Sequence, residues 1–410
     1  MFKLLITILP FLFLHWPLSA RVFPGDEWPQ WRGPKRDGIS QDTNLLKKWP
    51  GDGPKLLWRI PLGTGYSCVA VAGNKAYTMF DDGDDEFAIC LDAKSGQERW
   101  RFRTDKRYYN AQGGGSRVTP LIDGNLAYFI GGHARMYALD KESGTVVWQR
   151  DIITEFGGTL REFGYTSNPV ILGELLVVEG CGAANRSFIA FEKNSGDLVW
   201  SSQTEPPGYS SPIVVEIDGV RQVIFFAGTR IAALSPKNGD LLWSYPWPSD
   251  FNENVATPLY LSANTIFFSS GHPKGKGAAV LRIDTYGNDF MVKTLWKSNV
   301  MQNHFSTAIF YNGFIFGMDQ TILKCIKASN GEELWRKSGF GEGALILADG
   351  KLIVLGSRGR LALVHATPEG YREISSARVL RGRSLTPPAL AYGKLYLRNE
   401  REMICLDLKK

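Results

Sequence analysis

The chain has 410 residues, of which 44% are hydrophobic and 21% charged, and its formal net charge is +6. This is the composition of an ordinary globular protein, and it excludes a disordered chain. Lysines and arginines are scattered among acidic residues, which argues against nucleic-acid binding. The 44 glycines, together with few helical patterns, favour an all-β chain with many turns.

Residues 1–20 have the pattern of a secretory signal peptide. Lys3 provides the positive charge, an apolar run covers residues 4–14, and Leu18-Ser19-Ala20 offers small residues for cleavage. An uncleaved membrane anchor is the alternative, but the apolar run is shorter than a spanning helix requires. We therefore expect an exported, soluble protein, periplasmic or extracellular, with no stable membrane span after cleavage.

Residues 21–54 follow as a segment rich in Trp, Gly and Pro, without any strand or helix period. We call this segment the N-terminal arm. Its interpretation depends on the fold of the chain that follows it.

A hairpin pattern organises the rest of the chain, and residues 138–148 show it most clearly. An apolar strand ends at Asp140, a polar turn closes at Gly144, and a returning strand carries Trp148. The aspartate can accept backbone N–H groups at the turn, and the glycine can adopt positive φ. The tryptophan supplies a large apolar surface.

This hairpin recurs at intervals of about 40–50 residues, which is a spacing typical of propeller blades. Six of the seven complete hairpins end in Trp, and the seventh has Ile374 at that position. In one of the six, Arg282-Ile283-Asp284 leads to the Trp through a longer turn at Gly287. The six tryptophans are Trp100, Trp148, Trp200, Trp243, Trp296 and Trp335.

Each hairpin follows two further strand-like runs, so a unit contains four strands. The last unit stops at residues 405–408, before its outer strand, while residues 55–61, which include Trp58, form an unpaired strand near the other end of the chain. Pairing these two segments would close a ring and protect the exposed edges. The sequence therefore predicts an all-β, eight-bladed β-propeller of four-stranded antiparallel blades over residues 55–410.

The five cysteines point to packing and not to redox chemistry. Cys90, Cys325 and Cys405 occupy the position that Ala138 fills in its own repeat, a small buried position on the third strand. Cys68 and Cys181 lie outside this position, and a disulfide between them stays open. There is no CxxC motif and no spacing typical of a metal site.

The repeated A-x-D-x-x-x-G-x-x-x-W pattern resembles the tryptophan-docking motif of the pyrroloquinoline-quinone (PQQ) type propeller repeat. That family includes quinoprotein dehydrogenases and the BamB-type lipoproteins of outer-membrane barrel assembly. The resemblance covers residues 55–410, and residues 28–40 are similar to the lead-in of bacterial exported members. It implies that seven structural tryptophans dock between neighbouring blades: Trp58, Trp100, Trp148, Trp200, Trp243, Trp296 and Trp335.

Two interpretations of the N-terminal arm remain. It is either a ligand-gating or partner-binding arm, or a structural plug that lays Trp28 and Trp31 over one mouth of the ring. We favour the plug.

The loops that lead into the innermost strands of a propeller gather around one mouth of its channel. There the sequence offers polar, mixed-charge and tyrosine side chains that could orient a small anionic or polyhydroxyl ligand. The alternative is a hydroxyl lining that satisfies strand-end amides and channel water. The candidate ligand-binding residues are Tyr66, Arg117, Tyr165, Tyr209, Glu253, Asn254, His304, Glu342 and Arg383.

Two functions follow from the resemblance. The favoured one is a monomeric, non-catalytic scaffold of the cell envelope that binds a protein or peptide, or a glycan, with no catalytic residues, resident metal or cofactor. The alternative is a PQQ- and Ca²⁺-dependent alcohol or sugar dehydrogenase, with Glu253, Asn254 and Glu342 as oxygen ligands and Arg117 or Arg383 on a quinone carboxylate. The adjacent Cys-Cys pair of many such dehydrogenases is absent, as is the lipid-anchor cysteine of BamB-type proteins.

Overall fold

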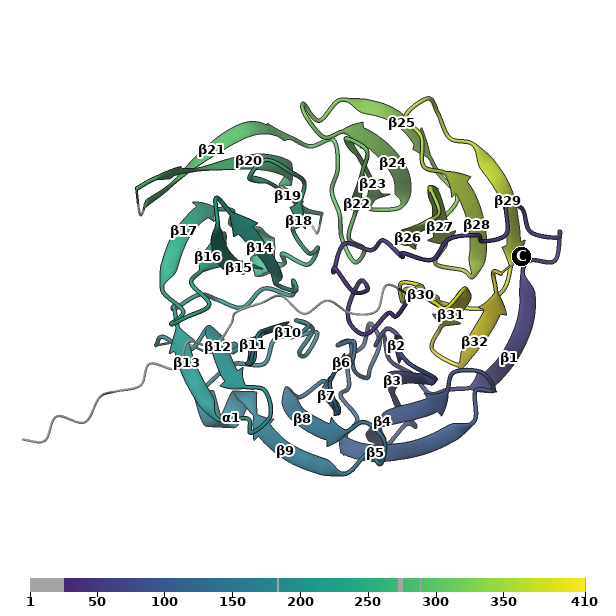
Figure 1. The fold of residues 1–410 in the computed structure, drawn as a ribbon, viewed down its shortest axis with the longest axis horizontal. Helices are drawn as coiled ribbons and strands as arrows, with labels where there is room; N and C mark the ends of the chain where they lie inside the picture. Colours follow the sequence, from purple (N-terminus) through teal and green to yellow (C-terminus); the bar gives the residue numbers. More distant parts are fainter. Residues whose placement is uncertain (1–25, 183, 272–275, 288, 410) are drawn as a thin grey trace, which may run out of the picture.

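A computed structural model shows a closed ring of eight four-stranded antiparallel sheets, the blades, around a common axis (Figure 1). It describes residues 26–182, 184–271, 276–287 and 289–409, so the predicted signal peptide (residues 1–20) lies outside the described residues. In those described ranges, no helix is long and apolar enough to cross a membrane. The predicted eight-bladed propeller is confirmed.

In blades 1 to 7 the innermost strand comes first in the chain and the outermost strand last, whereas blade 8 takes its outermost strand from the start of the propeller. The strands of blades 1 to 4 are, in order, β2 (Ala70–Ala72), β3 (Lys75–Asp81), β4 (Asp85–Asp92), β5 (Glu98–Lys106); β6 (Leu121–Asp123), β7 (Leu126–Ile130), β8 (Arg135–Asp140), β9 (Val146–Asp151); β10 (Val170–Leu172), β11 (Leu175–Glu179), β12 (Phe188–Glu192), β13 (Leu198–Ser202); β14 (Ile213–Ile217), β15 (Val220–Phe226), β16 (Arg230–Leu234) and β17 (Leu241–Pro246).

The strands of blades 5 to 8 are β18 (Leu259–Tyr260), β19 (Thr265–Ser270), β20 (Gly277–Tyr286), β21 (Asp289–Ser298); β22 (Ile309–Tyr311), β23 (Phe314–Asp319), β24 (Ile322–Lys327), β25 (Glu333–Lys337); β26 (Ala344–Ala348), β27 (Lys351–Leu355), β28 (Arg360–His365), β29 (Glu373–Arg378); β30 (Ala389–Ala391), β31 (Lys394–Arg398), β32 (Glu402–Asp407) and β1 (Lys55–Pro61). The helix α1 (Ile152–Phe156) and the 3₁₀ turn η1 (Asp250–Asn252) lie in loops between blades.

The ring closes where the sequence predicted. Strand β1 pairs antiparallel with β32, so that the outer strand of blade 8 comes from the start of the propeller and places Trp58 opposite Cys405. Arg398, buried on β31, crosses from blade 8 to blade 1, where it donates hydrogen bonds to Gly63 O at 3.1 Å and to Thr78 Oγ1 at 3.1 Å. The seam is therefore joined by backbone pairing and by a buried guanidinium.

The hairpin chemistry follows the predicted pattern. Asp140 Oδ1 accepts N–H bonds from Glu142 at 3.1 Å and from Ser143 at 2.8 Å, and Gly144 adopts φ 73°. Trp148 lies directly across the hairpin from Ala138, just before a β-bulge. A small residue at position 138 leaves room for the indole of Trp148.

Two details of the repeat alignment were wrong. In blade 5 the residue opposite Trp296 is Val280 and not Arg282, because the β20–β21 hairpin continues its strand pairing as far as Tyr286 and Asp289. In blade 7 the strand pairing puts Ser375 where Ile374 was expected, since Leu363, the residue just before the β-bulge, pairs with Ser375.

The docking tryptophans of six blades donate to the turn of the next blade. Trp100 Nε1 donates to Lys141 O at 3.2 Å, and a Cβ placed on Gly144 would lie 2.7 Å from the Trp100 ring. Trp58 has the same relation to Ala93 O and Gly96. In contrast, Trp243 donates within its own blade.

The N-terminal arm enters and leaves the ring on the face that carries the turns between innermost and second strands. At the entrance, Glu27 Oε1 accepts a hydrogen bond from Gly73 N at 2.8 Å, and Asp26 O accepts one from Tyr392 N at 3.0 Å. At the exit, Asp42 Oδ1 accepts from Gly393 N at 3.1 Å. Figure 1 shows the purple segment before β1 crossing the centre of the ring.

Between these two points the arm fills the channel and touches every blade. Its hydrogen-bond partners, taken from blade 1 to blade 8, are Val71, Ile122, Pro169, Pro212, Thr257, Thr307, Leu347 and Tyr392. Trp28 lies buried against blade 1, and not over the mouth of the ring. The arm is therefore a plug inside the channel.

All five cysteines are buried free thiols. The disulfide left open between Cys68 and Cys181 is not formed. Burial raises the pKa of Cys68, Cys90, Cys325 and Cys405 to about 12, which suits inert core residues.

Candidate functional site: the cavity at the channel mouth

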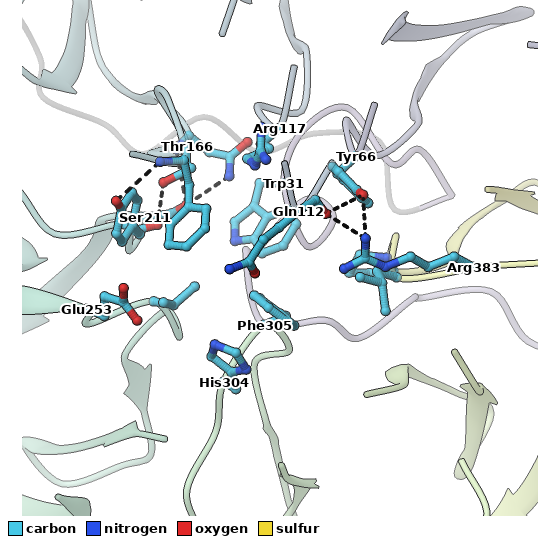
Figure 2. A pocket seen from close by; sticks show the side chains of 16 residues that line it. Trp31, Tyr66, Gln112, Arg117, Thr166, Ser211, Glu253, His304, Phe305 and Arg383 are labelled. Atoms are coloured by element: carbon cyan, nitrogen blue, oxygen red, sulfur yellow. Dashed lines mark hydrogen bonds between the residues drawn. The ribbon is translucent and has the colours of Figure 1, made fainter. Parts of the chain in front are cut away.

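A cavity of about 150 Å³ lies at the mouth formed by the loops that lead into the innermost strands. Figure 2 shows these side chains converging from different blades around Trp31. Six of the nine predicted candidates line it: Tyr66, Arg117, Tyr209, Glu253, His304 and Arg383. We call it the mouth cavity.

Trp31, at the tip of the N-terminal arm, forms the floor of the mouth cavity (Figure 2). Its indole Nε1 donates to Thr257 Oγ1 of blade 5 at 3.0 Å, which fixes the plane of the ring. The arm therefore contributes one side chain to the site as well as closing the channel beneath it.

Two buried arginines of the arm hold this tip in place. Arg32 donates to Ala308 O at 2.7 Å and Asp37 O at 2.7 Å, and Arg36 donates to Pro169 O at 2.8 Å. Burial lowers the pKa of Arg32 to about 10; burial, with a contribution from the charge of Arg32, lowers the pKa of Arg36 to about 9. Both guanidiniums keep their positive charge at neutral pH.

Tyr66 organises the cationic side of the cavity. The guanidinium carbons of Arg117 and Arg383 lie 5.3 Å and 5.7 Å from the centroid of its ring, within cation–π range. Its hydroxyl donates to Glu400 Oε1 at 2.5 Å and accepts from Arg383 at 3.2 Å. Burial, followed by the hydrogen bond to Glu400, raises the pKa of Tyr66 to about 12.

The loops themselves fix the two arginines of this side. Arg117 donates to Gly113 O at 2.7 Å and to Gly115 O at 2.9 Å, and Arg383 donates to Gln112 O at 2.6 Å. Burial lowers the pKa of Arg117. Backbone carbonyl groups of the loops thus hold each guanidinium in place near the Tyr66 ring.

Aromatic rings make up much of the remaining wall. The rings of Phe163 and Tyr209 lie with centroids 5.4 Å apart, and Arg161 stacks on Tyr209 at 4.4 Å. His304 stacks on Phe305 with centroids 3.7 Å apart. Flat apolar faces such as these suit a ligand that itself has a flat face.

Polar groups occupy the parts of the wall between the rings. Glu253 is the acidic side chain among the lining residues, and it lies across Trp31 from Arg383 (Figure 2). Ser211 Oγ accepts from Asn168 Nδ2 at 2.8 Å, so these two lining side chains are bonded to each other.

Three predicted candidates do not line the mouth cavity. Tyr165 is buried between blades, where its hydroxyl donates to Glu179 O at 2.8 Å. Asn254 is fully buried, and its amide donates to Ala227 O at 2.7 Å. Glu342 lies outside the lining, where its carboxylate is 3.7 Å from His304 Nδ1.

The prediction missed several lining residues, of which Trp31, Phe163 and Phe305 matter most. Phe163 and Phe305 lie in loops that the sequence placed at the mouth, but aromatic residues there resemble core residues. Trp31 was expected over one mouth as part of the plug, but it was not named among the ligand-binding candidates, because it lies far from those loops in the chain.

The structure does not assemble the calcium ligands that the dehydrogenase alternative requires. Ca²⁺ takes six to eight oxygen ligands, and of the three oxygen ligands proposed for it, Glu253 alone lines the mouth cavity. Within the described residues there is also no group of three or more His, Cys, Asp or Glu side chains that could hold a metal ion. The donor set therefore does not fit this ion.

The chain belongs to the PQQ-like β-propeller family. The family model described as "Outer membrane protein assembly factor BamB" matches residues 50–155 and 88–337. Among solved structures, BamB from Moraxella catarrhalis is similar over 86% of this chain and 99% of that chain, with a TM-score of 0.60 and 14% identity.

A second solved structure, the quinohemoprotein alcohol dehydrogenase ADHIIG from Pseudomonas putida HK5, covers 94% of this chain and 80% of that chain, with a TM-score of 0.55 and 9% identity. These two likenesses show the shared fold alone.

Two curated relatives are enzymes. Quinoprotein alcohol dehydrogenase PedH of Pseudomonas putida is 30% identical over 142 residues, which is 32% of this chain and 23% of the relative. Tetrathionate hydrolase of Acidithiobacillus ferrooxidans is 23% identical over 250 residues, which is 58% of this chain and 42% of the relative. The chain thus spans less than half the length of either relative.

Proposed function

We propose that this protein is an exported, non-catalytic scaffold of the cell envelope, which binds a ligand or a segment of a partner protein at the mouth cavity. The observation that carries this proposal is the arm inside the channel. It contacts all eight blades and gives the cavity a fixed tryptophan floor, above which aromatic rings and arginines converge. Such a site offers shape and charge for binding.

The family description, outer membrane protein assembly factor, supports a scaffold role. A broad, rigid propeller face with loops at its mouth can dock a protein or peptide. We expect the partner to be an envelope protein or peptide.

The quinoprotein dehydrogenase is the second candidate, and the partial similarity to PedH favours it. The aromatic floor and the paired arginines could receive a quinone that carries carboxylates. The positions of the proposed calcium ligands disfavour the dehydrogenase. The side-chain amide of Asn254 donates to buried backbone carbonyls, and Glu342 lies outside the cavity.

One experiment separates the two functions. The purified full chain is incubated with PQQ and Ca²⁺, passed through gel filtration, and tested for quinone absorbance and for dye-linked alcohol oxidation. A quinoprotein dehydrogenase stripped of its cofactor and treated in parallel serves as the control. We expect neither retained quinone nor oxidation; stoichiometric quinone with alcohol-dependent dye reduction would establish the dehydrogenase instead.

A further inference from the structure

Closure of the ring gathers exposed arginines from distant parts of the chain on blades 7 and 8, at the face that carries the mouth cavity. They lie near the end of β1, in the β27–β28 turn, at the end of β29 and in the loop after it, and in the β31–β32 turn. We call this set the arginine patch. Its members are Arg59, Arg358, Arg378, Arg381, Arg383 and Arg401. Of these, Arg383 lines the mouth cavity and the other five do not.

Asn399 joins two segments of the arginine patch. Its side-chain nitrogen donates to Arg381 O at 2.9 Å, and its side-chain oxygen accepts from Arg401 N at 2.9 Å. One amide group therefore fixes the loop after β29 to the β31–β32 turn.

The β27–β28 turn is bonded to the same loop on both sides of Arg358. Before it, Ser357 O accepts from Ser384 N at 2.9 Å. After it, Gly359 O accepts from Val379 N at 3.0 Å. The backbones that carry the patch are thus bonded to one another, and their arginines stay together as one charged surface.

Carboxylates offset two charges of the patch. Glu402 pairs with Arg59, and Glu400 lies 3.8 Å from Arg383. Within the described residues, the other four guanidiniums form neither an ion pair nor a hydrogen bond; they belong to Arg358, Arg378, Arg381 and Arg401. Like charges gathered on one surface repel one another and attract an anionic partner.

The composition of the patch favours a protein segment over a lipid surface as that partner. The patch contains arginine and no lysine, and the guanidinium fork matches the two oxygens of a carboxylate. Proteins that lie on membranes add apolar side chains that enter the lipid. Within the described chain, none of the exposed large hydrophobic side chains lies in residues 306–409, and Leu56 lies near the start of β1, at the opposite face.

We propose that the arginine patch docks an acidic segment of a partner protein, whose Asp and Glu side chains bind the four guanidiniums that lack a partner. These guanidiniums come from three separate segments of the fold, so a chain with several carboxylates matches them better than one small anion does. The inference goes beyond the proposed function, because it does not depend on what the mouth cavity binds.

Fluorescence anisotropy with the purified full chain tests the proposal. The probe is a dye-labelled octapeptide of alternating Glu and Ser, and the control is the same labelled peptide with Gln in place of Glu. We expect the acidic peptide to bind at least tenfold more tightly, and its affinity to fall as NaCl is raised, because salt screens exposed charges. Equal affinity for the two peptides, or no binding of the acidic one, would overturn the proposal.

A double substitution locates the bound peptide. Arg381→Gln with Arg401→Gln removes two exposed charges without breaking a side-chain hydrogen bond of the described chain, and we expect at least fivefold weaker binding. Arg372→Gln with Lys327→Gln removes the same charge from exposed positions on the opposite face and should leave the affinity unchanged. Equal weakening in the two variants would show attraction by net charge alone and contradict the assigned surface.

Sedimentation with lipid vesicles tests the other kind of anionic partner. Vesicles of phosphatidylglycerol and phosphatidylcholine are compared with vesicles of phosphatidylcholine alone, and we expect both to carry down the same small fraction of the chain. Sedimentation with the anionic vesicles that is lost in the Arg381→Gln, Arg401→Gln variant would assign the patch to lipid and overturn the proposal. Retained PQQ with alcohol oxidation would overturn the proposed function and leave this inference in place.

Discussion

Glycine and tryptophan in the repeat are two halves of one contact between blades. The indole of one blade lies so close to the glycine of the next turn that no Cβ fits between them, as at Trp100 and Gly144. The same glycine has positive φ, which L side chains adopt at a cost. Position 144 therefore requires glycine for two separate reasons.

These two reasons can be measured separately. Gly144→Ala should lower the free energy of unfolding by about 1 kcal/mol for the positive φ and by roughly 1–3 kcal/mol more for overpacking against Trp100. Gly219→Ala is the control, because Gly219 has φ 80° but no neighbouring atom within 4 Å of the place where a Cβ would lie. Urea unfolding of both variants gives the difference; equal losses would show that the indole contact does not constrain position 144.

Two buried carboxyl groups outside the mouth cavity make stability depend on pH. Glu86 accepts hydrogen bonds from Thr104 Oγ1 at 3.0 Å and from Gly132 N at 3.1 Å, and Glu179 accepts one from Gly208 N at 2.9 Å. Burial raises the pKa of each carboxyl to about 7. A carboxyl group with a raised pKa in the folded state is held there in its protonated form.

The sign of the pH effect follows from this. Between the unfolded pKa of about 4.5 and the folded pKa of about 7, the folded chain binds more protons than the unfolded chain. The stability contributed by each group is complete below pH 4.5 and is lost as the pH rises through 7, by an amount on the order of 3 kcal/mol. We expect urea unfolding to show decreasing stability from pH 5.5 to 8.

Glu86→Gln should make this decrease shallower, because the amide of glutamine does not titrate. The variant should still fold, since the amide can accept from Gly132 N and donate to Thr104 Oγ1. Glu98→Gln, at an exposed position on β5, is the control and should keep the native slope. Parallel curves for Glu86→Gln and the native chain would show that Glu86 does not carry the effect.

At the scale of elements, the N-terminal arm has a role that no blade performs. It has no regular secondary structure beyond isolated bridges, yet its residues bond to the innermost strands or their loops throughout the ring. The single side chain of Arg36 donates hydrogen bonds to two blades, at Pro169 O and Pro212 O. The arm therefore holds the inner strands together from within and at the same time fixes Trp31 under the cavity.

Arg36→Met tests this role. The substitution leaves buried carbonyls without a donor, and each orphaned acceptor costs about 1–3 kcal/mol. We expect a loss of at least about 2 kcal/mol in the free energy of unfolding, measured in urea. Lys35→Met changes the exposed neighbouring residue and should have little effect. A loss no larger than that of Lys35→Met would mean that the arm does not brace the ring.

Other elements show where the sequence was a poor guide. The helix α1 was not predicted; its five residues follow β9, where Phe156 packs on Phe191 between blades 2 and 3 with ring centroids 5.6 Å apart. In blade 7, the buried Trp49 of the arm donates its backbone N–H to Ser375 Oγ at 3.0 Å. Both details depend on packing between segments, and a repeat alignment cannot show them.

At the scale of the whole molecule, closure of the ring decides which parts of the chain meet. Pairing of β1 with β32 joins segments from the two ends of the described chain, and it leaves no blade with an open outer position. The loops before the innermost strands consequently face one another across a single mouth, although they are spread from Tyr66 to Arg383 in the sequence.

The sequence by itself determined the number of blades, the closing strand and the general position of the mouth. These features depend on short-range patterns, in which Asp, Gly and Trp at fixed spacing specify one hairpin and the count of hairpins specifies the ring. It also named six of the lining side chains, because they lie next to strand starts.

The tertiary structure alone decided the rest. Asn254 and Glu253 are adjacent in the chain, yet the first turns inward to backbone carbonyls and the second lines the cavity. Trp31 reaches the floor because the arm folds back inside the channel. Side-chain direction at a loop, and contact between segments far apart in the chain, depend on the packing of the completed ring, which local spacing does not encode.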